Sequence, residues 1–471
     1  MTNKLTLKSC FFGDRNFYSR VIKILIPIII QNTVTNVVSL LDNVMVGRVG
    51  TLEMSAVAIV NQLLFVFYIC IFGGISGAGI FSAQFAGAED HRGVRHCFRF
   101  KTYIALVMFA LALGVFLIFP DQLISMYLAE GTSAEDAAAT LGFARDYLLV
   151  MLIGILPFAL SQVYGSTLRE TGETKLPMIA SVAAILVNLV LNYILIFGNK
   201  GLPFLPLEPM GVVGAAIATV ISRYAELIII LLTVHRNKEK YPFISKLWAS
   251  LKIPGSLTLD ILKKGSPLLA NEFLWSLGVA MLLQCYSVRG LEVVAAANIT
   301  QTVANMFNVV FLAIGNAIAI MVGQQLGASK TEEAKLSVWR LLTLTVISCI
   351  VMAGIMIVLA PFIPSLYNTT EEVRHTATEL LDVVAVAMPF MGFSHSCYFT
   401  LRSGGKTFIT MLFDCVFMWA VSFTTAFVLA NYTSLPIIPL YAIVQSLEII
   451  KCFIGFILVK KGVWINNIIR A

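Results

Sequence analysis

Long continuous runs of apolar residues alternate along the chain with short polar segments. Each run reaches the roughly 20 residues that a helix needs to cross a bilayer. Every backbone group in lipid must be paired within the spanning structure, and continuous runs favour helices over a closed barrel. The pattern predicts an all-α membrane protein with spans at 19–46, 52–81, 97–119, 141–164, 175–197, 211–234, 264–287, 292–322, 336–360, 378–400, 407–429 and 436–459.

These twelve runs form two halves that repeat each other. A proline that opens an apolar run, a glycine that closes a short loop and a glycine that precedes a basic loop each recur 240 residues later. The pairs are Pro27 with Pro267, Gly50 with Gly290 and Gly87 with Gly327, followed by Pro157 with Pro389 and Arg169 with Arg402 at offsets of 232 and 233 residues. Such a repeat predicts two six-helix halves that rock about a central site, as secondary transporters do.

The longest polar break lies between the sixth and seventh spans. It covers 235–263, is basic and contains Pro242, Pro254 and Gly255. We therefore expect a first lobe at 1–234, a cytoplasmic linker at 235–263 and a second lobe at 264–471.

Composition excludes an ordinary soluble protein. The chain is 58% hydrophobic and only 13% charged, with a mean hydropathy of +0.86, whereas soluble domains carry about 25% charged residues.

The net charge of +7 reports on topology rather than on a nucleic-acid partner. We assign the N-terminus, the loops after even-numbered spans and the C-terminus to one side, and this side holds 27 of the 33 Lys and Arg residues. Such a bias marks the cytoplasmic side. It predicts a multi-pass protein of the plasma (inner) membrane with both termini in the cytoplasm and no nucleic-acid partner, because no basic patch is interleaved with aromatic residues.

Two carboxylates fall inside predicted spans, where ionisable groups are costly and usually functional. Asp42 lies past the middle of the first span, and Glu272 lies in the first half of the seventh. A carboxylate there can take up a proton or ionise beside a cation, which couples ion binding to conformation. The alternatives are an interfacial position for Asp42 and a structural helix pair for Glu272.

Amides and prolines add two further candidates. Asn188 and Asn192 are one helical turn apart in the fifth span, so they share a face and can either complete an oxygen shell around a cation or join helices. Pro27 and Pro267 each remove a backbone hydrogen bond within a span. We expect them to act as hinges, and bending at Pro27 would move Asp42 relative to its partners.

Four motifs in order, together with the repeat, resemble the MATE (multidrug and toxic compound extrusion) transporters, nearest to the bacterial NorM-like and DinF-like branches. The resemblance covers nearly the whole chain. The motifs are Asp42-Asn-Val-Met-Val-Gly47, Gln84-Phe-Ala-Gly87, Leu168-Arg-Glu-Thr-Gly172, and Asn192-Tyr-Ile-Leu-Ile-Phe-Gly198 with Gly211-Val-Val-Gly-Ala-Ala-Ile-Ala-Thr219.

The resemblance implies a V-shaped pair of six-helix lobes that works as a monomeric antiporter among membrane lipids. Such an antiporter exports cationic or amphipathic drugs in exchange for Na⁺ or H⁺ and needs no cofactor. By position, Asp42 matches the family's cation-binding carboxylate in the first lobe. If the coupling ion is sodium, Asp42 is the expected Na⁺ ligand. Asn188, Asn192 and Thr219 match its neighbours, and Glu272 matches the carboxylate of the second lobe that binds substrate or proton.

Two departures from the family pattern affect these expectations. Some members have Asp where this chain has Asn192, so the first lobe lacks one carboxylate. NorM-type members also carry an Asp in the tenth span, where this chain reads Met391-Gly-Phe-Ser-His395. Glu272 would therefore act without that partner.

The main alternative is a flippase for lipid-linked oligosaccharides, since such proteins share a related two-lobe fold. A flippase is expected to offer a basic cavity to phosphates, whereas the first and seventh spans here contribute acids. An intramembrane enzyme lacks support, because no HExxH or GxSxG motif occurs.

Overall fold

A computed structural model describes residues 10–127, 133–201, 206–367 and 369–470. Its regular structure within these residues is helical throughout, and 12 helical segments are long and apolar enough to cross a membrane. This confirms the predicted number of spans. The first half contains α2 (Arg15–Gly47), α3 (Thr51–Gly87), α4 (His91–Ile118), α5 (Pro120–Ser125), α6 (Ala134–Glu170), α7 (Lys175–Gly201) and α8 (Gly211–Arg236).

The second half repeats this order with two irregular spans. It contains α9 (Gly255–Ser287), α10 (Leu291–Gly327), α11 (Thr331–Leu359), α12 (Glu371–Ser403), α13 (Thr407–Met411), α14 (Thr424–Tyr432), α15 (Ile437–Ser446) and α16 (Glu448–Lys460). The eleventh span runs from α13 through the π-helical turns Leu412–Val416 and Met418–Phe423 into α14. Most helices begin or end several residues outside the predicted edges, because hydropathy marks the hydrocarbon layer and not the helix ends beyond it.

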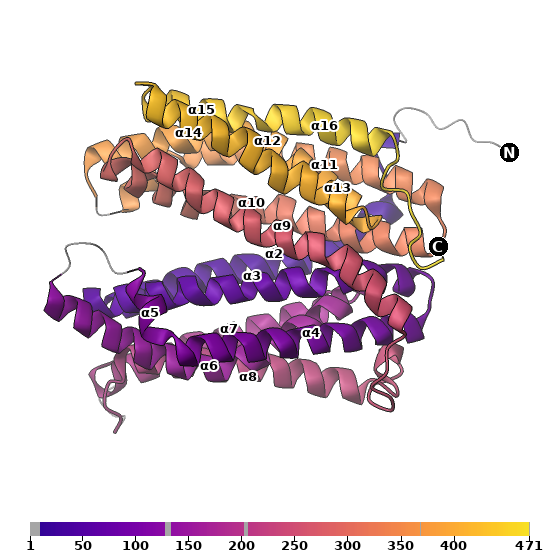
Figure 1. The fold of residues 1–471 in the computed structure, drawn as a ribbon, viewed down its shortest axis with the longest axis horizontal. Coiled ribbons are helices and arrows are strands. Elements are labelled where there is room, and N and C mark those ends of the chain that lie inside the picture. The colour runs from indigo at the N-terminus through magenta and orange to yellow at the C-terminus, as the bar shows by residue number, and fades with distance from the viewer. Residues whose placement is uncertain (1–9, 128–132, 202–205, 368, 471) are drawn as a thin grey trace.

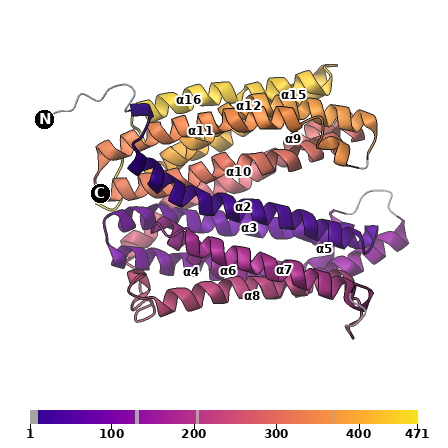
Figure 2. The ribbon, with the colours of Figure 1, turned by 180° about the vertical axis from the view of Figure 1, so that it is seen from behind.

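The two halves form separate layers that α2 and α9 cross obliquely (Figures 1 and 2). Val21 and Ile28, in the first part of α2, lie in a core cluster with α10, α11 and α12 of the second half. Val46, near the end of α2, lies in the core of the first half. The first helix therefore changes partners along its length, and Pro27 lies at the end of the part that contacts the second half.

The helix α9 repeats this arrangement in the opposite direction. Ile261 packs with Ala78 and Phe81 of α3, and Gly265 lies so close to Gly77 of α3 that a methyl group on Gly77 would collide with it. The far end of α9 packs within the second half instead. Both helices continue through their internal prolines, so Pro27 and Pro267 as hinges stay a prediction.

The halves meet at the end of the molecule where α2 begins and where the described chain ends (Figure 1). We call this contact the seam; it comprises residues 84–87, residues 324–327 and the segment 463–470. A side chain on Gly87 would collide with the backbone of Gln324, and one on Gly327 would collide with that of Gln84. Only glycine permits such an approach of two backbones.

Reciprocal hydrogen bonds join the halves across the seam. The Gln84 side chain donates to the Ser403 carbonyl at the end of α12 (3.2 Å), and the Gln324 side chain donates to the Glu170 carbonyl at the end of α6 (2.8 Å). Gln84 also donates to the Asn466 carbonyl (3.1 Å) and accepts from the Ile468 amide (2.9 Å). The C-terminal segment is thereby tied to the first half.

The linker between the halves is held against α4 rather than free. Arg99 donates to the carbonyl oxygens of Leu247, Lys252 and Lys246 at 2.8 to 3.3 Å. Lys240 forms an ion pair with Glu173 at 2.5 Å. Burial raises the pKa of Glu173. The hydrogen bond and the charge of Lys240, together with backbone hydrogen bonds, lower this pKa by more, so it lies below the usual value.

We predict that Gln84→Ala lowers the free energy of unfolding by about 1–3 kcal/mol, because it leaves buried backbone groups of the seam without partners. Thermal melting of the purified protein in detergent measures the loss. The control is Gln122→Ala in α5, whose side chain is exposed. Equal melting temperatures for Gln84→Ala and the wild type would contradict the seam described above.

Candidate functional site

The structure brings Asp42 of α2 together with three polar side chains of α7 and α8. Asn192 donates from Nδ2 to Asp42 Oδ1 at 2.7 Å and to Asn188 Oδ1 at 3.2 Å. Asn188 in turn lies 3.3 Å from Thr219 Oγ1. Asn188 and Asn192 are buried, with 6% and 2% of their surfaces exposed. The four residues named from the sequence therefore form one cluster inside the first half.

The Asn188 amide can face Asp42 with either end. With its nitrogen toward the carboxylate, it donates to Asp42 Oδ1 at 3.2 Å and Oδ2 at 3.1 Å, while its oxygen accepts from Thr219. A bare carboxylate favours the amide nitrogen, whereas a carboxylate that holds a proton or a cation favours the oxygen. The amide is thus suited to both states of Asp42.

Oxygen atoms dominate the cluster and suit a small hard cation. Asn192 Oδ1 is buried and has no hydrogen-bond partner among the described residues, which leaves an acceptor for an ion or a water molecule. Carboxylate, amide and hydroxyl oxygens are the ligands that alkali and alkaline-earth cations prefer. Within the described part of the chain, no three His, Cys, Asp or Glu side chains lie together as a metal site.

A cation of the protein lies near this cluster. Arg223 of α8 pairs with Glu226 at 3.8 Å and lies 4.9 Å above the Phe158 ring. Its charge also acts on Asp42. The carboxylate therefore feels one fixed positive charge, although no ion pair joins the two.

We predict that Asn192→Asp makes stability depend on a cation. Two carboxylates at hydrogen-bond distance cannot both stay ionised without a proton or an ion between them. Melting temperature should rise when Na⁺ replaces choline, or when the pH falls from 8 to 5, and by more than in the wild type.

The matched control is Asn199→Asp, an exposed amide at the end of the same helix. Its melting temperature should respond as the wild type does. An Asn192→Asp protein that melts independently of both Na⁺ and pH would contradict cation binding at this cluster.

The second half contains a longer polar network around Glu272 of α9. Tyr398 of α12 donates to Glu272 Oε1 at 3.2 Å, and Arg402 Nη1 lies 3.8 Å from the same oxygen. Asn271 donates to Asp414 Oδ2 at 3.1 Å and lies 3.4 Å from the Tyr398 hydroxyl. Glu272 is therefore connected to a second acid, Asp414, although the tenth span lacks the acid of NorM-type proteins.

A lysine neutralises the far end of this network. Lys451 of α16 lies 2.7 Å from Asp414 Oδ1 and 3.9 Å from Glu448 Oε1. Ser394 donates to the other oxygen of Glu448 at 2.7 Å. Glu448 lies one turn before Lys451 on the same helix, but the shorter contact of the lysine is to Asp414, in a different span.

The sequence analysis did not identify several cationic side chains that lie inside the helix bundle. Lys101 is fully buried in α4 and contacts Ser166, Thr167 and Glu170, the last at 2.5 Å. Lys101, Arg169, Arg402 and Lys451 are among the 27 charges that the sequence analysis assigns to the cytoplasmic side, and each lies in a helix. Arg169 and Arg402 fall just outside the predicted spans, because hydropathy cannot separate a helix end from a loop.

His395 lies in an aromatic environment. Its Nε2 is buried without a hydrogen-bond partner among the described residues. The ring packs against aromatic rings of Phe311, Tyr398 and Phe399 instead.

We predict that Lys451→Met lowers the free energy of unfolding by about 3–5 kcal/mol, because it leaves Asp414 charged and unpaired inside the bundle. The double variant Lys451→Met with Asp414→Asn should recover most of the loss. Thermal melting measures both proteins.

The control for this pair is Lys335→Met, since Lys335 also lies 2.7 Å from a carboxylate, that of Glu332, but on the exposed surface. Its loss should stay below about 1 kcal/mol. Equal losses for Lys451→Met and Lys335→Met, or no recovery in the double variant, would contradict the buried pairing.

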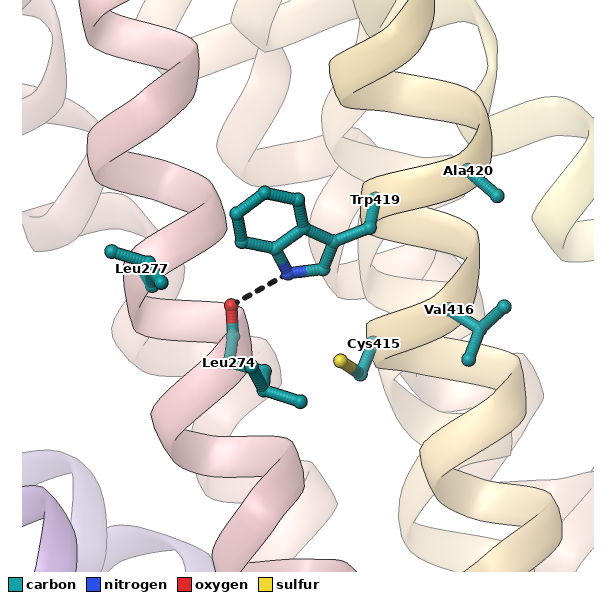
Figure 3. Close-up of a pocket in the computed structure, with 6 residues that line it drawn as sticks. All are labelled: Leu274, Leu277, Cys415, Val416, Trp419 and Ala420. Atoms are coloured by element: carbon teal, nitrogen blue, oxygen red, sulfur yellow. Dashed lines mark hydrogen bonds between the residues drawn. The ribbon is translucent and has the colours of Figure 1, made fainter.

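An apolar hollow lies beside this network, between α9 and the eleventh span. It has a volume of about 540 Å³ and is lined by Leu274, Leu277, Cys415, Val416, Trp419 and Ala420. Figure 3 shows Trp419 reaching across to α9, where its Nε1 donates to the Leu274 carbonyl at 3.0 Å. The hollow has no charged side chain, so it adds no ion-binding group to the site.

A second cavity lies between the halves beside the seam. It has a volume of about 90 Å³, and its lining includes Arg169 and Glu170 of α6 and Arg402 of α12. Arg169 and Arg402 are repeat partners in the sequence, so each half contributes one arginine.

Comparison with known proteins places this geometry in context. A family model described as MatE matches residues 27–194 and 267–428. A probable multidrug resistance protein NorM of Thermotoga maritima is 25% identical over 418 residues, which cover 88% of this chain and 86% of that protein. A probable multidrug resistance protein YoeA of Bacillus subtilis is 26% identical over 454 residues, which cover 93% and 94%.

Solved structures share the fold. A mutant of the Vibrio cholerae MATE transporter VcmN has a TM-score of 0.84 at 19% identity and covers 97% of this chain and 98% of that one. A MATE family transporter of the MOP superfamily in an outward-facing conformation has a TM-score of 0.82 at 19% identity and covers 98% of each chain. These likenesses confirm the fold class expected from the sequence.

Proposed function

This chain belongs to the MatE family, whose model matches more than half of it, and from that premise we propose that it exports cationic or amphipathic small molecules in exchange for Na⁺ or H⁺. The family assignment confirms the resemblance carried by its motifs. Its relatives are multidrug transporters and not enzymes.

The observation that carries the proposal is the course of α2. One part of this helix packs on the second half through Val21 and Ile28, and its other part holds Asp42 against Asn192 of the first half. A change at Asp42 therefore acts on a helix that spans both halves. Pro27, between the two parts, is the proposed hinge.

The coupling ion binds at Asp42 in this proposal, with Asn188, Asn192 and Thr219 as its neighbours. The oxygen-rich cluster and the unpartnered Asn192 oxygen support a cation there. With one carboxylate and no second acid in the cluster, the site suits either Na⁺ or H⁺, so the ion is left to experiment.

Glu272 is the proposed contact for the positive charge of a substrate. The Arg402 guanidinium, 3.8 Å away, partly neutralises this carboxylate, while Tyr398 donates to it. A cationic substrate would compete with Arg402 for Glu272, as would a proton. Pro267 lies five residues before Glu272 on α9. It is the proposed hinge of the second half and corresponds to Pro27 in the first.

Coupling follows if ion and substrate favour different states. An ion at Asp42 would disfavour bound substrate on the outer side, the halves would part at the seam, and ion release to the cytoplasm would let substrate bind. Only a difference in affinity between two states is required. The moving bodies are 1–234 and 264–471, joined by 235–263, in a monomer of the plasma membrane with both termini cytoplasmic.

A flippase for lipid-linked oligosaccharides is the second candidate considered. It would need a basic cavity large enough for a phosphate headgroup with its sugars. The cavity that contains Arg169 and Arg402 measures about 90 Å³, whereas ligand pockets for molecules of drug size have about 300–1,000 Å³. Two of this chain's relatives are named as probable multidrug resistance proteins, which supports the antiporter.

We predict that proteoliposomes containing the protein move ethidium when a Na⁺ gradient or, separately, a pH gradient is imposed. Asp42→Asn should lower the rate of this gradient-driven transport at least tenfold, because the amide can neither bind a proton nor carry the charge that attracts Na⁺. Ethidium fluorescence inside the vesicles reports the rate.

The matched control is Asp146→Asn, an exposed carboxylate of α6 outside the cluster, which should transport at the wild-type rate. Response to one gradient identifies the coupling ion. Wild-type transport by Asp42→Asn would reject Asp42 as the coupling site, and no response to either gradient would shift the proposal to lipid substrates.

A further inference from the structure

The cavity beside the seam brings together two arginines, one of which has unsatisfied hydrogen-bonding capacity. Arg402 has 8% of its surface exposed, and its buried Nη1 has no hydrogen-bond partner among the described residues. Arg169 lines the same cavity and is partly buried. Buried guanidinium donors normally have partners.

The nearby acids do not meet this need. Glu170 lines the cavity but is held at 2.5 Å by Lys101. Glu272 lies 3.8 Å from Arg402 and accepts from Tyr398, so it contributes charge without a short bond to the guanidinium. Glu226 also acts on Arg169, but it pairs with Arg223 at 3.8 Å. Among the charged side chains that line the cavity, two cations, Arg169 and Arg402, face one acid, Glu170. The surplus is one positive charge.

Amide groups from both halves also line the cavity. Gln162 belongs to the first half, and Asn316, which donates to the Leu312 carbonyl, belongs to the second. The Ser76 and Ser166 hydroxyls also line the cavity but donate to the carbonyls of Phe72 and Val163. Arg402 also stacks on Phe72 of the opposite half at 5.5 Å and on Phe399 at 5.3 Å. These rings fix the guanidinium plane beside the cavity.

We propose that this cavity binds a small inorganic anion or a small carboxylate between Arg169 and Arg402. The volume of about 90 Å³ holds several water molecules, a chloride or a formate, but not a drug. One arginine comes from α6 of the first half and the other from α12 of the second. The anion therefore bridges the two halves beside Gln84 and Gln324 and stabilises the closed seam.

Under the proposed alternation between two states, the bound anion would affect transport. A ligand that binds only when the halves meet shifts the population toward that state. A small anion then stabilises contact between the two halves on the cytoplasmic side, at a site separate from the cation at Asp42. Its binding does not require that drugs be the substrate.

Hydrogen exchange at the seam tests the proposal without a transport assay. Mass spectrometry follows the amides of 84–88 and 324–328 in chloride, formate or gluconate at constant Na⁺ concentration and pH. Exchange in the wild type should be about threefold slower or more in chloride or formate than in gluconate, which is too large for the cavity. Arg169→Lys should keep part of this protection, whereas Arg169→Gln and Arg402→Gln should lose it.

The matched control is Arg145→Gln, an arginine with 55% of its side chain exposed in α6, which should keep the full anion effect. Equal exchange of the wild type in all three anions would overturn the proposal, as would protection that persists in both glutamine variants. The comparison of anions in the wild type decides the matter even if a variant does not fold. Failure of ethidium transport would leave this result unaffected.

Discussion

Exclusion of water from the membrane interior is the constraint on which the structure depends. A polar group there must find its partner within the protein, because no solvent is present to hydrogen-bond it. The acids and cations of this chain accordingly lie in clusters between helices. Asp42 meets Asn192, Asp414 meets Lys451, and Glu170 meets Lys101. Each pairing fixes which helices are neighbours and leaves few groups free to respond to an ion.

The groups that remain incompletely satisfied are concentrated in two places. Asp42 has amide donors but no ion pair, and the neighbouring Asn192 oxygen has no partner. Arg169 and Arg402 lie beside the seam, where Arg402 Nη1 has no hydrogen-bond partner among the described residues. Structural charges such as Lys451 are neutralised permanently, whereas these two places are suited to exchange a ligand. The helices α2 and α9, which cross between the halves, connect both places to the packing of the whole molecule.

Much of this fold could be predicted from the sequence because apolar length and repetition are local signals. Twelve apolar runs correspond to twelve spans, and the repeated glycines indicated two halves. That Gly87 and Gly327 meet each other across the seam is known only from the structure. The spacing of Asn188 and Asn192 indicated a shared face, and the structure brings that face to Asp42. The division at 235–263 stays a prediction, although α9 begins within it at Gly255.

Contacts between distant helices could not be predicted in this way. The sequence shows that Glu448 and Lys451 share a face, but not that Asp414 of another span lies closer to the lysine. Arg169 and Arg402 stand next to polar loops, so hydropathy assigned them to the surface. The crossing of α2 from one half to the other depends on tertiary packing, which no single-helix pattern reports.

The most direct test of the central claim is a distance across the seam, measured by pulsed electron paramagnetic resonance. Spin labels replace the exposed His91 of the first half and the exposed Glu332 of the second, after other reactive cysteines are removed. If Asp42 controls the seam through α2, the label distance changes with Na⁺ or with pH in the wild type and becomes insensitive to both in Asp42→Asn. A distance that responds equally in the two proteins, or in neither, would contradict the account.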